Sequence, residues 1–310
     1  MTLVSVDPAI AAAKFLKAPF ALNHALSDHP LFSLPRLVHL AKSLPRDRIE
    51  YNSGKLKPGV RPEDVPTLDM PADEVISQIE TANAWMVIKF VQEDPEYAAL
   101  LEDFVAGAQA LAGRKPGDYS ELQGFIFVSS AKSVTPFHLD AEENILVQIK
   151  GDKFAHIFDN RDCSLISEEA MEISPSKHRN QRYEESFEQR AEVFTMKEGD
   201  AVHMPYMWPH WIRTGERYSI SMAMTWKTPE VLRLNKIRLI NGTLRRFGLG
   251  QKPPGVSPVL DGLKVLAHDA MRAVIDPLRK SETARRLIRR IIYGKKANYY
   301  LKDAKPGGMS

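Results

Sequence analysis

Residues 135–153 contain side chains that can bind a metal ion next to side chains that can bind an anion. His138 and Asp140 are separated by a single residue, and a second histidine, His210, follows in the proline- and tryptophan-rich segment 205–210. Two histidine nitrogens and one carboxylate leave several coordination positions open, an arrangement that suits divalent iron. The other polar candidates in the same stretch are Thr135, Asn144 and Lys153.

The segments around this motif predict short β-strands. Residues 125–128, 144–149 and 154–158 are apolar runs, and Gly151-Asp152 predicts a tight hairpin between the last two. Strand alternation would place His138 and Asp140 on one face. Because a lone His-x-Asp pair also occurs by chance, with the histidine buried or on the surface, it is this strand context that indicates a metal site.

Helical patterns precede and follow the predicted strands. The spacing of apolar residues predicts helices over 8–17 and 35–44, a helix from 72 whose apolar stripe ends at Met86, and another over 96–112, whereas 48–69 reads as loop. Trp85 flanks that stripe and reads as core packing, with a role in substrate binding as the alternative. Further strands are predicted at 193–196, 201–204, 210–214 and 218–226, and further helices at 230–247 and 260–293.

These elements divide the chain into three parts. We expect a helical N-terminal region over 1–120, a strand-rich domain over 121–228 and a basic helical region over 229–310. Short strands at close spacing favour an antiparallel barrel or sandwich. The polar stretch 159–190 reads as an insertion between strands, and loops of this length are often binding lids.

Composition indicates a soluble globular protein. Of 310 residues, 44% are hydrophobic and 26% are charged, and no run of eighteen apolar residues predicts a membrane span. The first seventeen residues lack the features of a secretory signal. Cys163 is the only cysteine, which excludes an internal disulfide and a thiolate zinc site and fits a reducing, cytoplasmic compartment.

The net charge of +3 conceals an uneven distribution. Residues 231–310 contain eighteen Lys or Arg and five Asp or Glu, a balance of +13, and the first 230 residues carry 24 basic and 34 acidic groups, a balance of −10. Such a split can indicate nucleic acid, an acidic partner or a membrane surface. It is also typical of a helical tail that docks on the chain's own acidic body or forms a homodimer.

Taken together, the motifs resemble the JmjC-like branch of the cupin superfamily, the Fe(II)- and 2-oxoglutarate-dependent oxygenases. The pattern Thr-Pro-x-His-x-Asp, then Asn, then Gln-Ile-Lys-Gly-x-Lys resembles that of the asparaginyl hydroxylase acting on hypoxia-inducible factor, and it recurs here from Thr135 to Lys153 with the same spacing. A second motif, Gly-Asp followed by Pro205 and His210, also matches. The resemblance covers residues 122–226.

The resemblance implies a double-stranded β-helix, or jelly-roll barrel, flanked by helices. It implies that His138, Asp140 and His210 bind iron, that Lys153 and Thr135 hold the distal carboxylate of 2-oxoglutarate, and that Asn144 lies beside the cosubstrate or metal. A lysine aimed into a barrel is costly unless it meets an anion, which agrees with that role. The implied reaction consumes O2, releases succinate and CO2, and hydroxylates a protein or small-molecule substrate, with demethylation possible where the carbon is bound to nitrogen.

One position departs from the family pattern. The last strand of the asparaginyl hydroxylase carries an Asn that falls here at Met224, so this cosubstrate contact is absent or supplied by Ser221. His203 is the chief rival to His210 as third ligand, although the motif spacing favours His210. The alternative function is a non-catalytic cupin that binds a ligand, or a partner or nucleic acid through its basic C-terminal region.

Overall fold

The structure is a computed structural model that describes residues 2–60, 64–176 and 180–278. The chain forms two compact units, Met1–Leu232 and Arg233–Ser310. All of the candidate site residues lie in the first unit. The division into 1–120, 121–228 and 229–310 stays a prediction.

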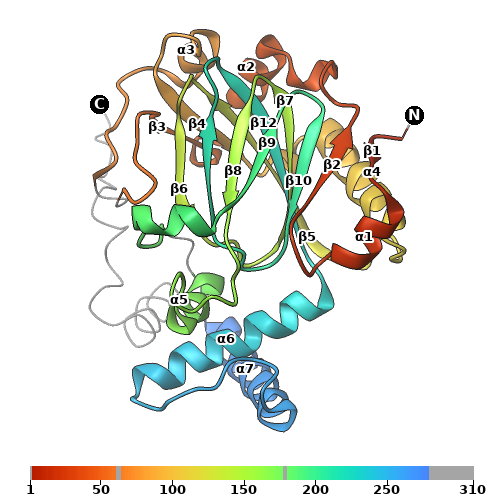
Figure 1. The fold of residues 1–310 in the computed structure, drawn as a ribbon, viewed down its shortest axis with the longest axis vertical. Helices are drawn as coiled ribbons and strands as arrows, with labels where there is room; N and C mark the ends of the chain where they lie inside the picture. The colour runs from red at the N-terminus through yellow and green to blue at the C-terminus, as the bar shows by residue number, and fades with distance from the viewer. Residues whose placement is uncertain (1, 61–63, 177–179, 279–310) are drawn as a thin grey trace. The chain divides into compact units, whose positions relative to one another are not determined.

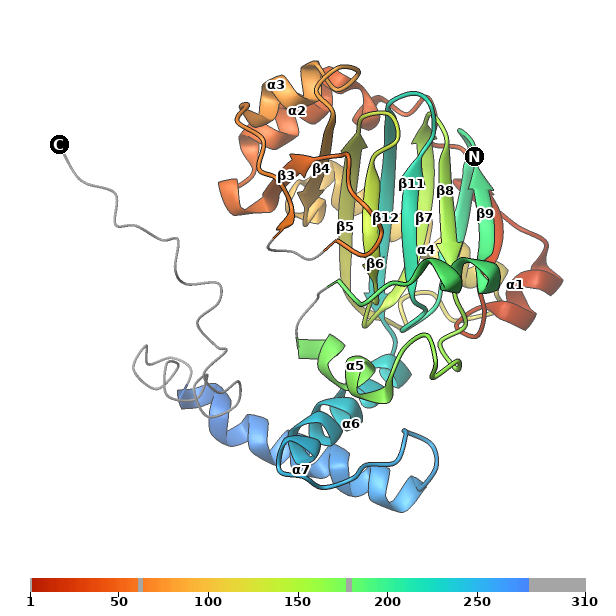
Figure 2. The same ribbon diagram turned by 60° about the vertical axis from the view of Figure 1, so that its left-hand side comes forward.

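Two β-sheets form the centre of the first unit and are stacked face to face (Figures 1 and 2). The larger sheet has the strand order β1 (Val4–Ser5), β2 (Phe20–His24), β10 (Asp200–Met204), β7 (Glu143–Lys150), β12 (Ser219–Lys227), β5 (Ser120–Ser129), β4 (Ala84–Lys89) and β3 (Ile49–Ser53). The smaller sheet has the order β6 (Val134–His138), β11 (His210–Thr214), β8 (Lys153–Ile157) and β9 (Glu192–Met196).

The chain passes repeatedly between these sheets. From β5 onward it alternates from the larger to the smaller sheet and back, except that β8 and β9 are neighbours in the smaller sheet, and every pairing is antiparallel. This path is that of a double-stranded β-helix. The predicted fold class, a mainly β jelly-roll barrel with helical additions, is confirmed.

The turn at Gly151 connects β7 of the larger sheet to β8 of the smaller sheet. Gly151 has φ +73°, and a Cβ there would lie 2.3 Å from the carbonyl oxygen of Tyr218, so only glycine fits. The predicted tight turn is present, but the prediction that it closes a hairpin is wrong. Strands β7 and β8 do not pair, because β7 lies between β10 and β12 and β8 lies between β11 and β9.

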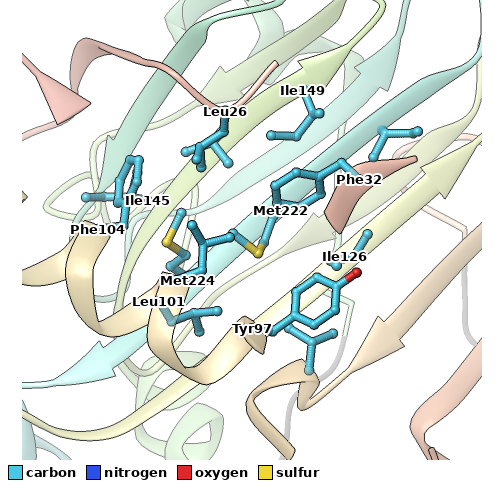
Figure 3. Close-up of a cluster of buried hydrophobic side chains, with 14 of the residues drawn as sticks. Leu26, Phe32, Tyr97, Leu101, Phe104, Ile126, Ile145, Ile149, Met222 and Met224 are labelled. Atoms are coloured by element: carbon cyan, nitrogen blue, oxygen red, sulfur yellow. The ribbon is translucent and has the colours of Figure 1, made fainter. Parts of the chain in front are cut away.

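Helices cover the outer face of the larger sheet and enclose the main core there. Helix α4 (Pro95–Leu111) begins at Asp94, whose carboxylate accepts a hydrogen bond from the amide of Glu96. Its apolar side packs Leu101 and Phe104 against side chains of β7 and β12 (Figure 3). The outward-facing residues of β12 in this core include Met222 and Met224. The opposite residues of β12 therefore face the barrel interior.

The N-terminal region contains strands that sequence periodicity misread. The helix predicted from residue 72 ends early, since α3 spans only Ala72–Ser77, and Met86 lies in β4. Strand β4 is buried on both faces and pairs with β3 and β5, so its apolar run lacks alternation and fits a helical stripe equally well. The loop predicted over 48–69 contains β3, and β2 was missed.

Of the remaining helices, those near the two ends of the chain agree with the predicted pattern, whereas the helix in the insertion was not predicted. Helices α1 (Pro8–Lys14) and α2 (Leu34–Ser43) lie near the N-terminus, and α5 (Glu168–Ile173) lies in the insertion. The chain then forms α6 (Pro229–Arg246) and α7 (Pro258–Leu278). Residues 279–293 of the last predicted helix lie outside the described residues. Among the helices of the described ranges, none is long and apolar enough to cross a membrane.

Candidate metal centre and anion pocket

His138, Asp140 and His210 converge at one end of the barrel. One ligand atom from each lies within 4.8 Å of the other two. Asp140 Oδ1 is 3.8 Å from Nε2 of His138, and its Oδ2 is 3.6 Å from Nε2 of His210. The two histidines are direct neighbours across β6 and β11, at the end of one strand and the start of the other. The structure thus brings together all three residues expected to bind metal.

Backbone carbonyl groups orient both imidazoles. Nδ1 of His138 lies 2.7 Å from the carbonyl oxygen of Pro136, and Nδ1 of His210 lies 2.9 Å from that of Trp208. A carbonyl oxygen only accepts, so Nδ1 carries the proton in each ring, and Nε2 of the neutral ring keeps its lone pair. Both of these Nε2 atoms lie beside the Asp140 carboxylate, as metal ligation requires.

Electrostatics keep His138 neutral. Burial lowers the pKa of His138 to about 4, and the neighbouring His210 acts in the same direction, while Asp140 and the carbonyl of Pro136 oppose them. A neutral imidazole is the form that binds a metal ion.

Asp140 does not lie on a strand with His138, contrary to the prediction. Strand β6 ends at His138, and Asp140 belongs to the connection to β7. Its carboxylate is held by other contacts instead. The amide nitrogen of Asn144 donates to Asp140 Oδ2 at 3.3 Å, and the carbonyl oxygen of Asp140 accepts from the amide of Met207 at 2.9 Å. Asn144 therefore lies beside the metal ligands, and its Oδ1 has no hydrogen-bond partner among the described residues.

Lys153 is a buried cation inside the barrel. It is 2% exposed, and burial lowers its pKa to about 7. Nζ donates to Ser221 Oγ at 2.6 Å and lies 5.2 Å from the centroid of the Phe127 ring. Among the described residues no carboxylate lies within ion-pair distance of Nζ. A buried ammonium group without a counter-ion is costly, so this position suits an anionic ligand.

Thr135 lies on the inner face of the smaller sheet, opposite Ile212 of β11. Its hydroxyl oxygen accepts a hydrogen bond from Nε1 of Trp85 at 2.9 Å. The Trp85 ring also contacts Phe127, with centroids 5.8 Å apart. The prediction of Trp85 as core packing is therefore incomplete. Periodicity gave no signal for this contact, because Trp85 was assigned to a helix.

Strand β12 resolves the departure from the family pattern. Met224 points into the main core, between the larger sheet and the helices that cover it, so it cannot contact a ligand inside the barrel. Ser221 points inward and reaches Lys153. Thr225 lies on the same face as Ser221 and is the register partner of Asn144. Thr225 Oγ1 is buried and has no hydrogen-bond partner among the described residues.

His203, the rival third ligand, lies on the other side of the larger sheet. Its ring stacks between Phe15 and Phe20, with centroids 4.9 and 5.0 Å away. Its Nε2 is 3.3 Å from a carboxylate oxygen of the buried Glu143. The geometry accounts for His203 by packing and by this acidic neighbour, away from the metal ligands.

The outer edge of β6 is closed by two distant segments of the chain. The amide of Phe137 donates to the carbonyl oxygen of Pro58 at 2.8 Å, and its own carbonyl oxygen accepts from Gln181 at 2.7 Å. Asn180 forms an isolated bridge with His138. The predicted insertion therefore touches the strand that carries a metal ligand.

The fold and the site together define a cupin-type barrel with two histidines and one carboxylate at its open end. The model of the cupin-like domain family matches residues 39–230, and the chain belongs to this family. The family part of the resemblance seen in the sequence is thus confirmed. No curated protein sequence matches the chain.

The chain also matches solved structures at low sequence identity and with TM-scores below 0.5. The ribosomal oxygenase YcfD of Escherichia coli, in complex with cobalt and 2-oxoglutarate, is 16% identical with a TM-score of 0.49; the match covers 82% of this chain and 61% of that one. YcfD in complex with cobalt and succinic acid is 14% identical with a TM-score of 0.45, over 93% of this chain and 71% of that one. A variant of Bacillus subtilis oxalate decarboxylase is 15% identical with a TM-score of 0.24, over 34% of this chain and 20% of that one.

Proposed function

We propose that the protein is an Fe(II)- and 2-oxoglutarate-dependent oxygenase that hydroxylates a protein side chain or a small molecule. One observation supports this most strongly: a two-histidine, one-carboxylate cluster with oriented rings lies in the same barrel as a buried lysine that has no acidic partner. The first feature fits divalent iron, and the second fits a dicarboxylate.

The residues present fit the metal. His138 and His210 would hold it through Nε2, and Asp140 through its carboxylate. The carbonyl groups of Pro136 and Trp208 keep both rings in the binding tautomer, and Asn144 fixes the carboxylate through Oδ2. Three protein ligands leave positions open for a chelating cosubstrate and O2.

The pocket around Lys153 fits the distal carboxylate of 2-oxoglutarate. Lys153 would pair with it, and the hydroxyl groups of Thr135 and Ser221 would donate hydrogen bonds to it. Asn144 would lie between this pocket and the metal. When bound, Fe(II) and 2-oxoglutarate would supply, with O2, an oxidative decarboxylation in which one oxygen atom of O2 enters succinate as CO2 is released and the other enters a C–H bond of the substrate.

Apolar residues keep water from this region of the barrel. The inward-facing cluster consists of buried residues, Leu146, Ala155, Ile157, Met196, Val202, Met204, Ile212 and Ala223. The larger rings of Phe125, Phe127, Phe194 and Trp208 pack against it. A dry site protects a reactive centre from side reactions and strengthens the interactions of Lys153 with an anion.

Substrate-dependent release of succinate tests the proposal. The purified chain, supplied with Fe(II), 2-oxoglutarate and O2, is screened against peptides and small molecules, and succinate is measured. Binding of 2-oxoglutarate is measured separately on protein loaded with Mn(II). Turnover that depends on both Fe(II) and 2-oxoglutarate supports the oxygenase. Absence of 2-oxoglutarate binding in the presence of Mn(II) would contradict the oxygenase proposal and favour a non-catalytic cupin. Mass spectrometry of the product distinguishes hydroxylation from demethylation.

The C-terminal unit is proposed to form a homodimer. Helix α7 carries a stripe of exposed apolar side chains at helical spacing, including Val259, Leu263, Leu266 and Val274, each more than half exposed. A second copy of this helix would cover them. Deletion of residues 255–310 should then give a monomer in light scattering.

Nucleic-acid binding through the basic residues would instead give an affinity that falls steeply with salt. A cytoplasmic location stays a prediction.

A further inference from the structure

Two side-chain hydrogen bonds connect the sheets inside the barrel, and they share one chemical pattern. Trp85, on β4 of the larger sheet, donates to the Thr135 hydroxyl on β6 of the smaller sheet at 2.9 Å. Lys153, on β8 of the smaller sheet, donates to the Ser221 hydroxyl on β12 of the larger sheet at 2.6 Å. In each pair a nitrogen donates a hydrogen bond to a hydroxyl group, and a hydroxyl group can both accept and donate.

This pattern fixes the role of each hydroxyl. An indole N–H group has no lone pair to accept with, and neither has Lys153 in its protonated form, the form that pairs with a carboxylate, so Thr135 and Ser221 use an oxygen lone pair in these contacts. Their own O–H groups remain available to donate. Among the described residues, no protein acceptor takes a hydrogen bond from either hydroxyl. Both hydroxyl groups are therefore ready to donate to a ligand.

The two pairs border the same space. Ala84, Met86 and Ile88 of β4 point into the outer core, so Trp85 points to the inner face of the sheet. The Phe127 ring contacts a member of each pair, with its centroid 5.8 Å from that of Trp85 and 5.2 Å from Lys153 Nζ.

We propose that Trp85 is a positioning residue of the cosubstrate pocket, which acts by holding the Thr135 hydroxyl as a hydrogen-bond donor. With Lys153 doing the same for Ser221, the pocket offers donors alone. Such a pocket accepts an ionised carboxylate, whose oxygens only accept, and disfavours groups that must donate. The inference rests on the proposed function, because it assigns the pocket to 2-oxoglutarate.

A role in packing alone makes a different prediction. If Trp85 served only to fill space against Phe127, a phenylalanine would replace most of that contact, and the state of the Thr135 hydroxyl would not matter. If Trp85 acts through Thr135, loss of the indole N–H weakens binding only while the hydroxyl is present. The substitutions Trp85→Phe and Thr135→Val, alone and together, separate these possibilities.

Calorimetric titration of 2-oxoglutarate into the full-length, Mn(II)-loaded protein measures the effect. Thr135→Val should weaken binding by roughly 10- to 100-fold, since it removes a hydrogen bond to a charged group. Trp85→Phe should weaken it by about 3- to 10-fold. In the Thr135→Val background, Trp85→Phe should change it by less than about twofold. Equal losses in both backgrounds, or no loss in either, would overturn the proposal.

Two controls keep the result interpretable. 2-Oxopentanoate has the chelating end of 2-oxoglutarate without the distal carboxylate, so its affinity should be the same for the parent protein and Trp85→Phe. Loss of affinity for both compounds would indicate general damage and overturn the positioning role. Trp211→Phe alters an indole on the outer face of the smaller sheet, where it stacks on His156, and should leave 2-oxoglutarate binding unchanged. Failure of the parent protein to bind 2-oxoglutarate would instead count against the proposed function.

Discussion

The candidate metal-ligand cluster and the proposed anion pocket around Lys153 lie in one barrel but are held in place in different ways. Each histidine of the metal cluster is oriented by a carbonyl group two residues earlier in the chain, Pro136 for His138 and Trp208 for His210. The pocket around Lys153 depends on side chains distant in sequence, 68 residues away for Ser221, and Trp85 lies 50 residues from Thr135. The orientation of each histidine is therefore local, although the two meet only when β6 pairs with β11, whereas the contacts around Lys153 and Thr135 exist only once the two sheets have come together.

This difference predicts how each region responds to substitution. Damage to the metal-ligand cluster should stay confined to metal binding, because both histidines are supported by backbone groups that no side-chain change removes, and the side-chain support that Asn144 gives Asp140 comes from only four residues along the chain. Damage to the pocket should alter both ligand binding and the stability of the contact between the sheets.

The substitution His138→Ala should abolish metal binding while the fold survives. Loss of an outer-shell partner already costs about 10- to 100-fold in metal affinity, so loss of a ligand should exceed about 100-fold. Titration with Mn(II) measures the affinity, and circular dichroism checks the fold. The matched control is His156→Ala, a histidine of the same sheet that stacks on Trp211 on its outer face. Unchanged Mn(II) affinity in His138→Ala would remove it from the ligand set.

Lys153→Met should abolish 2-oxoglutarate binding and stabilise the ligand-free protein. The pKa of Lys153 in the folded state, about 7, lies below its ordinary value of 10.5, so the unfolded state binds more protons between these values. Stability of the parent protein therefore rises with pH across this window and is lowest below pH 7. Replacing the buried cation with an apolar chain should add roughly 1–4 kcal/mol at pH 7, a gain that shrinks towards pH 10.5.

Denaturant unfolding at pH 7 and pH 10 measures this change in free energy. Lys150→Met is the control, because Lys150 is an exposed lysine of β7 that contacts Glu198 at the surface. A destabilised Lys153→Met protein at pH 7 would show that Lys153 contributes more to the contact between the sheets than its burial costs.

Asn144→Ala should weaken metal binding by about 10-fold without loss of the fold. It removes the amide that donates to Asp140 Oδ2 and leaves all three ligands in place. Asn23→Ala is the control, since Asn23 makes an exposed contact to Asp200 at the sheet edge. Mn(II) affinity equal to that of the parent protein would show that Asp140 needs no side-chain support.

The smallest effect is a pH dependence of 2-oxoglutarate affinity. In the ligand-free protein Lys153 has a pKa of about 7, so it is increasingly neutral above that pH. It must then take up a proton to pair with a carboxylate. Affinity should fall by about fivefold from pH 7 to pH 8. Calorimetry in buffers of different ionisation enthalpy measures the proton uptake directly. Equal affinities, with no proton uptake at pH 8, would mean that Lys153 stays charged without ligand.

Sequence patterns predicted the barrel strands well and the N-terminal strands poorly. The strands of residues 120–227 carry alternation or short apolar runs next to turn residues, and these signals are local. Strand β4 is buried on both faces, so its sequence has no alternation to read, and its identity depends on pairing with β3 and β5. The hairpin predicted at Gly151 failed for a related reason, since a turn sequence does not reveal whether the strands it joins belong to one sheet.

For the site residues too, the sequence predicted what depends on local motif spacing and missed what depends on the fold. Motif spacing located His138, Asp140 and His210, which the structure brings together, although it placed Asp140 on a strand that ends at His138. The contact of Trp85 with Thr135 could not be predicted, because it requires the fold. The assignment of a missing Asn to Met224 ignored the alternation that turns this residue outward.

The closed edge of β6 has a consequence for any attempt to isolate the barrel. Both of its covering segments matter: the carbonyl groups of Gly54 and Pro58 accept from β6, and Gln181 donates to it. A fragment starting at residue 121 would contain every metal ligand, yet it would leave the ligand-bearing strand with unpaired backbone groups. Exposed strand edges pair with other chains. Such a fragment should aggregate through the very strand that carries His138, and a well-behaved minimal protein must begin before Gly54.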